Sequence, residues 1–330
     1  MTSKVALFGL AICGAMSGCS ASTEGTSAGA SSSSGSGGAG GAYDLPDCRD
    51  GWCLIPAGSF VKGSPPDEYG HHENSERQAN VTLSRSFVMM QYEITREEWA
   101  PFAYDPTGEI PHDIISAECV EPDCPVANLT WFEMAAYSNW LSEREGLDSC
   151  YELLECTGEV GHAYACERMR VRAPSISECA GYRMPTEAEW EYAYRAGTTT
   201  AFYPGDIWPQ LNGEQECEYQ PSLGPIAWFR CNSGNRMHPK GQMQPNPWGL
   251  YDMAGNNSEW THSVYRKDYT TLPPIDPSPD GETLDERIAK GGGFNSWVTL
   301  CRAASHLAVP WYGHGFGGRL VRTLRGGEAW

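Results

Sequence analysis

The chain has 330 residues, a formal net charge of −19 and an apolar fraction of 40%, so it is long enough to bury a hydrophobic core. Its pI is near 4.8 and it has no basic run, which excludes nucleic acid as an expected partner, because phosphate contacts need clustered Lys and Arg. No stretch of about eighteen apolar residues occurs, so no membrane-spanning helix is predicted.

The N-terminal residues have the pattern of a bacterial export signal. A positive residue precedes the apolar stretch 5–16, and residues 16–19 (MSGC) resemble a bacterial lipobox. On this interpretation residues 1–18 are a lipoprotein signal peptide, and Cys19 receives the lipid that anchors the chain to the membrane. The alternative is an ordinary secretory signal that is cut near Ala21.

The residues after Cys19 predict where the chain resides and how it is divided. Ser20 follows the lipidated position, and by resemblance to sorted lipoproteins this indicates the outer membrane of a bacterial cell envelope, on its periplasmic or cell-surface face. Residues 19–44 are nearly all Ser, Gly, Ala and Thr, a composition typical of a flexible tether. Residues 45–330 contain no linker-like stretch and no fixed-period repeat, which predicts one large domain.

Local signals in this domain predict a few short helices and strands. Helix starts, each a Thr followed three residues later by Glu, occur at Thr95, Thr130 and Thr186. The second leads into an apolar stripe of about 14 residues. Brief β-like runs lie at 80–83, 87–90 and 319–323. The remainder is rich in Gly, Pro, Asn and Trp, so we expect an α+β domain with much irregular structure and no doubly wound sheet.

Thirteen cysteines in an exported chain predict disulfides that staple the loops of the domain. The chain has no CxxC, which argues against a zinc site. One cysteine of the domain, Cys301, is left without a near neighbour. The exact connectivity stays open, but ten cysteines fall into local pairs: Cys48 and Cys53, Cys119 and Cys124, Cys150 and Cys156, Cys166 and Cys179, and Cys217 and Cys231.

Several longer motifs follow one another along the domain: 55–60 (IPAGSF), 125–131 (PVANLTW), 181–193 (GYRMPTEAEWEYA), 246–256 (NPWGLYDMAGN), 290–294 (KGGGF) and 319–322 (RLVR). In this order they resemble the motifs of the formylglycine-generating-enzyme family, also called the sulfatase-modifying factor family. The resemblance covers about residues 52–325. It implies a single large domain of variant C-type-lectin-like fold, poor in regular secondary structure.

The resemblance also implies a structural calcium site in the turn after residue 251. The family's ligands correspond to the side chains of Asp252 and Glu259 and to the backbone carbonyls of Gly255 and Asn257. Calcium is a hard cation that takes several oxygen ligands, and a glycine-containing turn exposes carbonyls that supplement carboxylates. The alternative is a hydrogen-bonded loop without an ion.

Active members of the family hold Cu(I) between two cysteines that follow the glycine-rich motif, and they oxidise a cysteine of a substrate protein to formylglycine. Here Ser296 occupies the first of these positions, and an ungapped register puts Cys301 at the second. A register anchored on Arg302 instead brings Val298 there. In both registers at least one thiolate is missing, and a hydroxyl is a poor ligand for the soft Cu(I) ion. Copper is therefore not expected.

The favoured hypothesis is a divergent family member that binds a ligand or peptide through the segment 293–317. The partner would be an exported protein, a peptide or a glycan. An equally plain interpretation is that these side chains only pack and form turns, and a purely structural envelope protein stays open as well. The candidate ligand-binding residues are Ser296, His306, Trp311, Tyr312 and His314.

The alternative hypothesis is a divergent oxidoreductase of the same family that acts on protein or thiol substrates, with Cys301 as the catalytic group. Positive neighbours lower the pKa of a thiol and favour the reactive thiolate. Arg302 is adjacent to Cys301 and His306 is nearby. The competing interpretation is that Cys301 is a small buried hydrophobic residue.

Overall fold

The computed structural model of the protein describes residues 47–103, 119–208, 217, 220–278, 285–326, 328 and 330. All of them belong to one structural unit, Tyr43–Trp330. The predicted signal peptide, lipidation site and tether lie outside the described residues. Among those that are described, no helix has the length and apolar character needed to cross a membrane.

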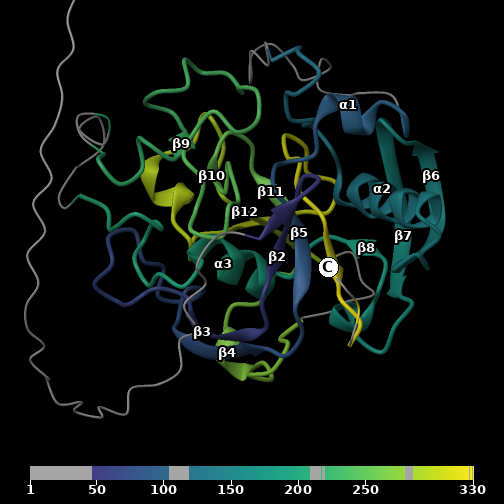
Figure 1. The fold of residues 1–330 in the computed structure, drawn as a ribbon, viewed down its shortest axis with the longest axis horizontal. Helices are drawn as coiled ribbons and strands as arrows, with labels where there is room; N and C mark the ends of the chain where they lie inside the picture. The colour runs from purple at the N-terminus through teal and green to yellow at the C-terminus, as the bar shows by residue number, and fades with distance from the viewer. Residues whose placement is uncertain are drawn as a thin grey trace, which may run out of the picture. The chain divides into compact units, whose positions relative to one another are not determined.

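A five-stranded antiparallel sheet joins the beginning of the domain to its end (Figure 1). The C-terminal strand β14 lies between β5 and β8, so residues more than 200 apart along the chain pair directly, as Val321 does with Met89. The β-like runs predicted from the sequence are confirmed as strands. In spatial order the sheet contains β1 (Cys48–Arg49), β2 (Trp52–Ile55), β5 (Phe87–Met90), β14 (Val321–Thr323) and β8 (Tyr182–Arg183).

Smaller sheets surround this central one. Hairpins are formed by β3 (Gly58–Lys62) with β4 (Ala79–Leu83) and by β6 (Tyr151–Glu159) with β7 (His162–Val171). A three-stranded antiparallel sheet contains β11 (Glu259–Val264), β12 (Arg287–Lys290) and β13 (Leu307–Val309). The short strands β9 (Ala227–Trp228) and β10 (Ala254–Gly255) pair in parallel.

The three predicted helix starts are confirmed as N-caps with complete capping boxes. Thr95 caps α1 (Arg96–Trp99), Thr130 caps α2 (Trp131–Arg144), and Thr186 caps α3 (Glu187–Arg195). In each case the Thr side chain accepts a hydrogen bond from the backbone N–H of the Glu three residues later, and that Glu accepts one in return. Short 3₁₀ turns are found at Ile176–Glu178, Tyr269–Thr271 and Val298–Cys301.

Two large clusters of buried side chains form most of the core, one around α3 and the other around α2, and a smaller third cluster includes the disulfide Cys119–Cys124. Trp190 of α3 is fully buried, as are Trp131 of α2 and Trp260 of β11. Buried indoles need a hydrogen-bond acceptor. Accordingly, Trp131 Nε1 donates to the carbonyl of Thr261 at 2.8 Å, and Trp260 Nε1 donates to that of Leu129 at 2.9 Å. These contacts link α2 to β11 and position the segments between them.

The described residues form five disulfides, and three of them match the local pairs predicted from the sequence: Cys48–Cys53, Cys119–Cys124 and Cys217–Cys231. The other two expected pairs, Cys150 with Cys156 and Cys166 with Cys179, are wrong. The structure instead joins Cys156 to Cys166 and Cys150 to Cys179. The reason is the hairpin β6–β7, which places Cys156 directly opposite Cys166.

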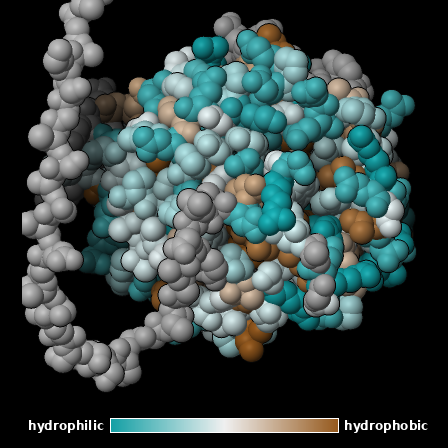
Figure 2. Space-filling view, viewed as in Figure 1, coloured by the Kyte–Doolittle hydropathy of each residue, from teal (hydrophilic) through white to brown (hydrophobic). Residues whose placement is uncertain are grey.

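The face shown in Figure 2 is largely hydrophilic, and its apolar residues form small separate areas. Four large apolar side chains are more than half exposed among the described residues: Val120, Trp208, Ile275 and Tyr312. Single exposed apolar residues of this kind are normal on a protein surface. Tyr312 is the one that coincides with a predicted ligand-binding residue.

Candidate functional site

The glycine-rich motif folds the following segment back against itself. Gly291 and Gly292 have φ angles of +87° and +66°, a region that favours glycine. A Cβ atom on Gly292 would lie 3.0 Å from Sγ of Cys301. Gly292 therefore lets the backbone approach the thiol closely, and the 3₁₀ turn Val298–Cys301 closes the loop.

Cys301 is a buried thiol in the core cluster around α3. Its exposed fraction is 0%, and burial raises the pKa of the thiol to about 12. The expectation that Arg302 and His306 lower this pKa is wrong. The guanidinium of Arg302 instead binds the carboxylate of Glu76 at 2.8–2.9 Å, and His306 Nδ1 lies 3.3 Å from Oε1 of Glu187. These are features of a structural cysteine rather than of a reactive thiolate.

Ser296 closes a tight turn within the same segment. Its hydroxyl accepts a hydrogen bond from the backbone N–H of Gly293 at 2.9 Å, and its own N–H donates to the carbonyl of Gly293 at 2.9 Å. The side chain is mostly buried. It therefore has a local structural role, although it was a candidate ligand-binding residue.

The turn predicted to bind calcium begins at Asp252, which is buried and has a φ of 54°. Its Oδ2 accepts a hydrogen bond from the N–H of Gly241 at 2.7 Å, whereas its Oδ1 is buried without a hydrogen-bond partner among the described residues. Burial and, to a smaller extent, the nearby Glu259 raise the pKa of Asp252 to about 6 against the lowering effect of the Gly241 N–H and Arg319. A Cβ atom on Gly255 would lie 2.1 Å from the carbonyl oxygen of Trp228, so this position requires glycine.

The other predicted side-chain ligand, Glu259, already has strong partners. Arg319 donates to both of its carboxylate oxygens at 2.7–3.0 Å, and Trp190 Nε1 donates to Oε2 at 3.0 Å. The side-chain amide of Asn257 donates to the carbonyl of Val126 at 3.3 Å. Asn257 is thus fixed in place by this side-chain hydrogen bond.

A third carboxylate, Glu93, belongs to this cluster and was missed by the sequence analysis. It is fully buried and accepts hydrogen bonds from Asn256 Nδ2 at 2.8 Å and from the N–H of Asn257 at 3.0 Å. Burial, with Asp252 and Glu259 as neighbours, raises its pKa well above the usual range. The available signal was its place two residues before Thr95, which the sequence analysis used as a helix start.

His306 is the predicted ligand-binding residue that the structure places at a cavity. A pocket of about 250 Å³ is lined by its ring together with Thr299, Arg302, Ser305 and Tyr265. The side chain is only 4% exposed, and its ring centroid lies 5.7 Å from that of Tyr265. Buried polar side chains that converge on a cavity are typical of ligand sites.

Buried ion pairs adjoin the His306 side of this pocket. Lys62 Nζ lies 3.1 Å from Oε1 of Glu187, and Lys290 Nζ lies 3.5 Å from Oε2 of Glu191. Although burial acts to raise it, Lys62 and His306 hold the pKa of Glu187 well below its usual range. Glu187 is therefore ionised, and its Oε1 faces Nδ1 of His306 at 3.3 Å.

The remaining candidates, Trp311, Tyr312 and His314, do not line the pocket of His306. Trp311 packs edge-on against Phe132 of the core, with ring centroids 5.3 Å apart. Tyr312 is 57% exposed, and His314 is also exposed. The structure therefore divides the five predicted residues among a turn, a pocket and a surface loop.

Comparison with known proteins identifies the family. Residues 46–324 match the profile of the FGE-sulfatase family, described as "Sulfatase-modifying factor enzyme 1-like domain". The chain belongs to this family. The observed mixture of small helices and sheets, stapled by disulfides, is the fold that the sequence analysis expected.

Relatives of this FGE-sulfatase family member carry several different names. The chain is 28% identical over 258 residues to "Chaperone protein LppX" of Paenibacillus barcinonensis, covering 76% of this chain and 80% of that protein. It is 26% identical over 279 residues to the formylglycine-generating enzyme of Thermomonospora curvata, covering 78% and 89%. It is 24% identical over 273 residues to the mouse protein named "Inactive C-alpha-formylglycine-generating enzyme 2", covering 77% of each chain.

Solved structures show the same fold. Treponema denticola variable protein 1 superposes with a TM-score of 0.62 at 24% identity, covering 82% of this chain and 94% of that one. PvdO from Pseudomonas aeruginosa superposes with a TM-score of 0.61 at 21% identity, covering 85% and 97%. At these identities the likeness concerns the fold alone.

The two metals implied by the FGE-sulfatase family fit this chain differently. Cys301 is the one free cysteine of the described residues, and it is buried, so the segment after the glycines does not supply two thiolates for Cu(I). The calcium turn fits better, because three carboxylates face one guanidinium and Oδ1 of Asp252 lacks a partner. Asp252 and Glu259, with the carbonyls of Gly255 and Asn257, are the groups that would hold a structural Ca²⁺ there.

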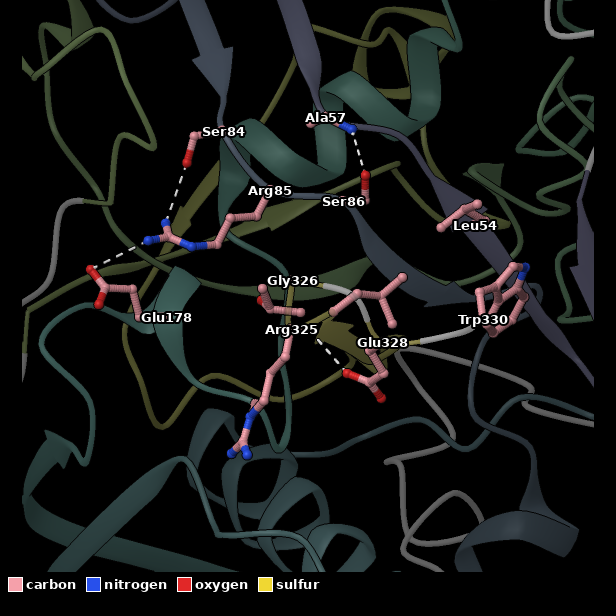
Figure 3. A pocket seen from close by; sticks show the side chains of 13 residues that line it. Leu54, Ala57, Ser84, Arg85, Ser86, Glu178, Arg325, Gly326, Glu328 and Trp330 are labelled. Carbon is pink, nitrogen blue, oxygen red and sulfur yellow. Dashed lines mark hydrogen bonds and ion pairs between the residues drawn. The ribbon is translucent and has the colours of Figure 1, made fainter.

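A larger cavity of about 720 Å³ lies at the ends of β2, β5 and β14 (Figure 3). None of the residues predicted from the sequence lines it. Its polar groups bind one another: Arg85 lies 3.8 Å from Glu178, the hydroxyl of Ser86 accepts from the N–H of Ala57 at 3.0 Å, and Glu328 accepts from the N–H of Arg325 at 3.0 Å. One buried group of its lining, Nε1 of Trp330, has no hydrogen-bond partner among the described residues.

Proposed function

We propose that this protein is an exported lipoprotein of the bacterial cell envelope whose FGE-sulfatase domain binds a ligand and does not catalyse copper-dependent oxidation of cysteine. The burial of Cys301 carries the proposal. Its thiol is 0% exposed and its pKa is raised to about 12. A group in this state offers neither a thiolate for Cu(I) nor a nucleophile for thiol chemistry.

The proposed location rests on the N-terminal sequence. Residues 16–19 (MSGC) resemble a lipobox, and Ser20 favours the outer membrane. Labelling of cells with radioactive palmitate tests this part: label on the full chain and its loss in Cys19→Ser are expected. Label that persists in Cys19→Ser, or none on the parent chain, would refute the lipid anchor.

The proposed binding surface is the segment 293–317. It contributes His306, Arg302 and Ser305 to a pocket, and it carries Tyr312 on an exposed loop. The partner class is an exported protein, a peptide or a glycan. The names of two relatives, a chaperone protein and an inactive formylglycine-generating enzyme, support a role for such a domain other than oxidation.

The absence of oxidase activity is tested directly. The full chain, purified with its disulfides formed, is loaded with Cu(I), supplied with O₂ and a Cys-x-Pro-x-Arg peptide, and followed by mass spectrometry. The proposal expects no aldehyde and no tight copper binding, both in the parent and in Cys301→Ser. Aldehyde that forms in the parent and disappears in Cys301→Ser would overturn it, because one buried thiol would then suffice for the chemistry.

A further inference from the structure

We propose that the pocket of His306 binds an uncharged, hydroxyl-bearing ligand of the size of one sugar unit, as found at the end or along the chain of a neutral glycan. This inference rests on the proposed ligand-binding function and names the ligand class for that same segment. It is carried by the cavity, by the engagement of the one guanidinium in its wall and by one buried imidazole that lines it.

The pocket is formed where the segment 293–317 meets two other parts of the chain. Thr299, Ser305 and His306 come from that segment, whereas His72 comes from the loop between β3 and β4, and Tyr265 follows β11. Its volume of about 250 Å³ lies just below the range of drug-sized sites, about 300–1,000 Å³. It therefore admits one small unit rather than an extended chain.

The cations in the wall and next to it are already engaged by carboxylates. The guanidinium of Arg302 donates to Glu68 at 2.7 Å and to both oxygens of Glu76 at 2.8–2.9 Å. Glu187 is neutralised by Lys62 at 3.1 Å. An anionic ligand would have to be desolvated without a free cationic partner, which is costly. An uncharged ligand avoids this cost.

The imidazole of His306 lies beside the carboxylate of Glu187. Its Nδ1 lies 3.3 Å from Oε1 of that ionised carboxylate, within ion-pair distance but without hydrogen-bond geometry. The adjacent negative charge favours the tautomer with the proton on Nδ1. In the neutral ring Nε2 is then an acceptor, and it has no hydrogen-bond partner among the described residues. Because the ring is buried and lines the cavity, Nε2 is the acceptor that the pocket offers to a ligand hydroxyl.

Two further side chains of the pocket carry hydroxyl groups, which suit a sugar ligand. Tyr265 and Thr299 line the pocket, and their hydroxyls make no hydrogen bond to the part of the chain that is described, so both can donate or accept. The phenol ring of Tyr265 adds an apolar face. Sugars present hydroxyls beside apolar C–H faces, whereas a peptide needs partners for successive backbone amides, which a pocket of this size does not provide.

The test uses the full chain and defined probes. Glucose, N-acetylglucosamine and their linear trimers are titrated against protein with labelled histidine rings, beside glucuronate as a charged analogue and Gly-Ser-Gly as a peptide. We expect a neutral saccharide to shift the ring signals of His306 and glucuronate to bind more weakly. His306→Asn keeps an amide near the position of Nδ1 only, and we expect it to weaken saccharide binding about fivefold to tenfold. His306→Gln places an amide near the position of Nε2, and we expect it to recover most of the lost affinity.

The outcomes separate this inference from the proposed function. Saccharide binding with the expected order of the two variants supports the inference. If Gly-Ser-Gly binds at this pocket and no saccharide does, the glycan inference is overturned while ligand binding by the segment stands. If a saccharide binds without any change at His306, or if both variants bind like the parent at unchanged Tm, the pocket is not the site. If no probe binds and aldehyde is formed with copper, both proposals fail.

Discussion

The guanidinium of Arg319 donates three hydrogen bonds to the carboxylate of Glu259, at 2.7, 2.8 and 3.0 Å. This ion pair is fully buried and joins β11 to the segment that leads into β14. It also engages Glu259, which the sequence analysis expected to be a side-chain ligand of calcium. One guanidinium neutralises one carboxylate, so the remaining negative charge of the cluster resides on Asp252 and Glu93, whose pKa values are raised.

When a chelator keeps Ca²⁺ from the protein, Asp252→Asn is expected to stabilise the fold. The pKa of Asp252 is raised from 3.8 to about 6 by burial, so its ionised form costs folding free energy. Stability is therefore greatest below about pH 4 and falls as the pH rises to about 6. At pH 7.5 the variant should gain on the order of 1–3 kcal/mol, and at pH 4 it should match the parent. Asn also tolerates the left-handed backbone found at this position.

Urea unfolding in EDTA at several pH values measures this difference. A variant that is less stable than the parent at pH 7.5, or a parent whose stability does not fall between pH 4 and 6, would show that the Asp252 carboxylate is better compensated than the structure indicates. Glu93 shifts in the same direction, so a residual slope in the variant is expected.

Calcium is expected to reverse the order of the two proteins. If Oδ1 of Asp252 is a ligand, Ca²⁺ neutralises the excess charge and raises the Tm of the parent by mass action. Asp252→Asn should show little gain, because an amide oxygen is a weaker ligand for a hard cation. Differential scanning calorimetry with and without millimolar Ca²⁺ provides the comparison, and Mg²⁺ serves as a control of similar charge. An equal rise in both proteins would place calcium elsewhere.

Cys301 is expected to resist thiol reagents in the native state. At a pKa of about 12, on the order of one thiol in 10⁴ is ionised at pH 8, and the group is shielded by the core. Alkylation by iodoacetamide should therefore follow unfolding, with a rate that rises through the urea transition. Cys301→Ala should cost about 1–2 kcal/mol through lost packing and leave ligand binding intact. Rapid alkylation without denaturant would revive the oxidoreductase hypothesis.

How much the sequence could predict depended on how local each signal was. The capping boxes at Thr95, Thr130 and Thr186 lie within four residues, and all three helix starts were predicted. The hairpin β6–β7 was missed, because its strands mix apolar and charged residues on both faces. Its cysteines were consequently paired by proximity in sequence, which fails once a hairpin brings Cys156 opposite Cys166.

The candidate site depended on contacts between distant parts of the chain. Glu93 reaches Asn256 across 163 residues, and Glu187 meets His306 from a different element. No periodicity or spacing predicts such contacts, since they follow from how the sheets pack. The sequence could nominate His306 and Cys301, but only burial and partners show that the first lines a pocket and the second is part of the core.

The two disulfides of the α2–β7 region should differ in their contribution to stability. Cys150–Cys179 closes a separation of 29 residues, and Cys156–Cys166 closes one of 10. Chain entropy predicts about 1 kcal/mol more for the longer loop. The double variants Cys150→Ala/Cys179→Ala and Cys156→Ala/Cys166→Ala, compared by urea unfolding, measure this. Peptide mapping without reduction tests the pairing itself, and a Cys150–Cys156 cross-link would contradict the structure.

Trp311 and Tyr312 are adjacent, yet their alanine variants should have different effects. Trp311 packs against Phe132 with ring centroids 5.3 Å apart, so Trp311→Ala removes core contacts and should lower stability by about 2–4 kcal/mol. Tyr312 is 57% exposed, so Tyr312→Ala should change stability by no more than about 0.5 kcal/mol. Thermal unfolding distinguishes the two.

Tyr312→Ala is therefore the variant that can report on binding by the loop. A loss of saccharide affinity at unchanged Tm would mean that the exposed ring contacts the ligand beyond the pocket of His306. Unchanged affinity would confine recognition to that pocket, and a Tm as low as that of Trp311→Ala would show that the loop folds around Tyr312. Trp311→Ala cannot make this distinction, because weaker binding there follows equally from a disturbed core.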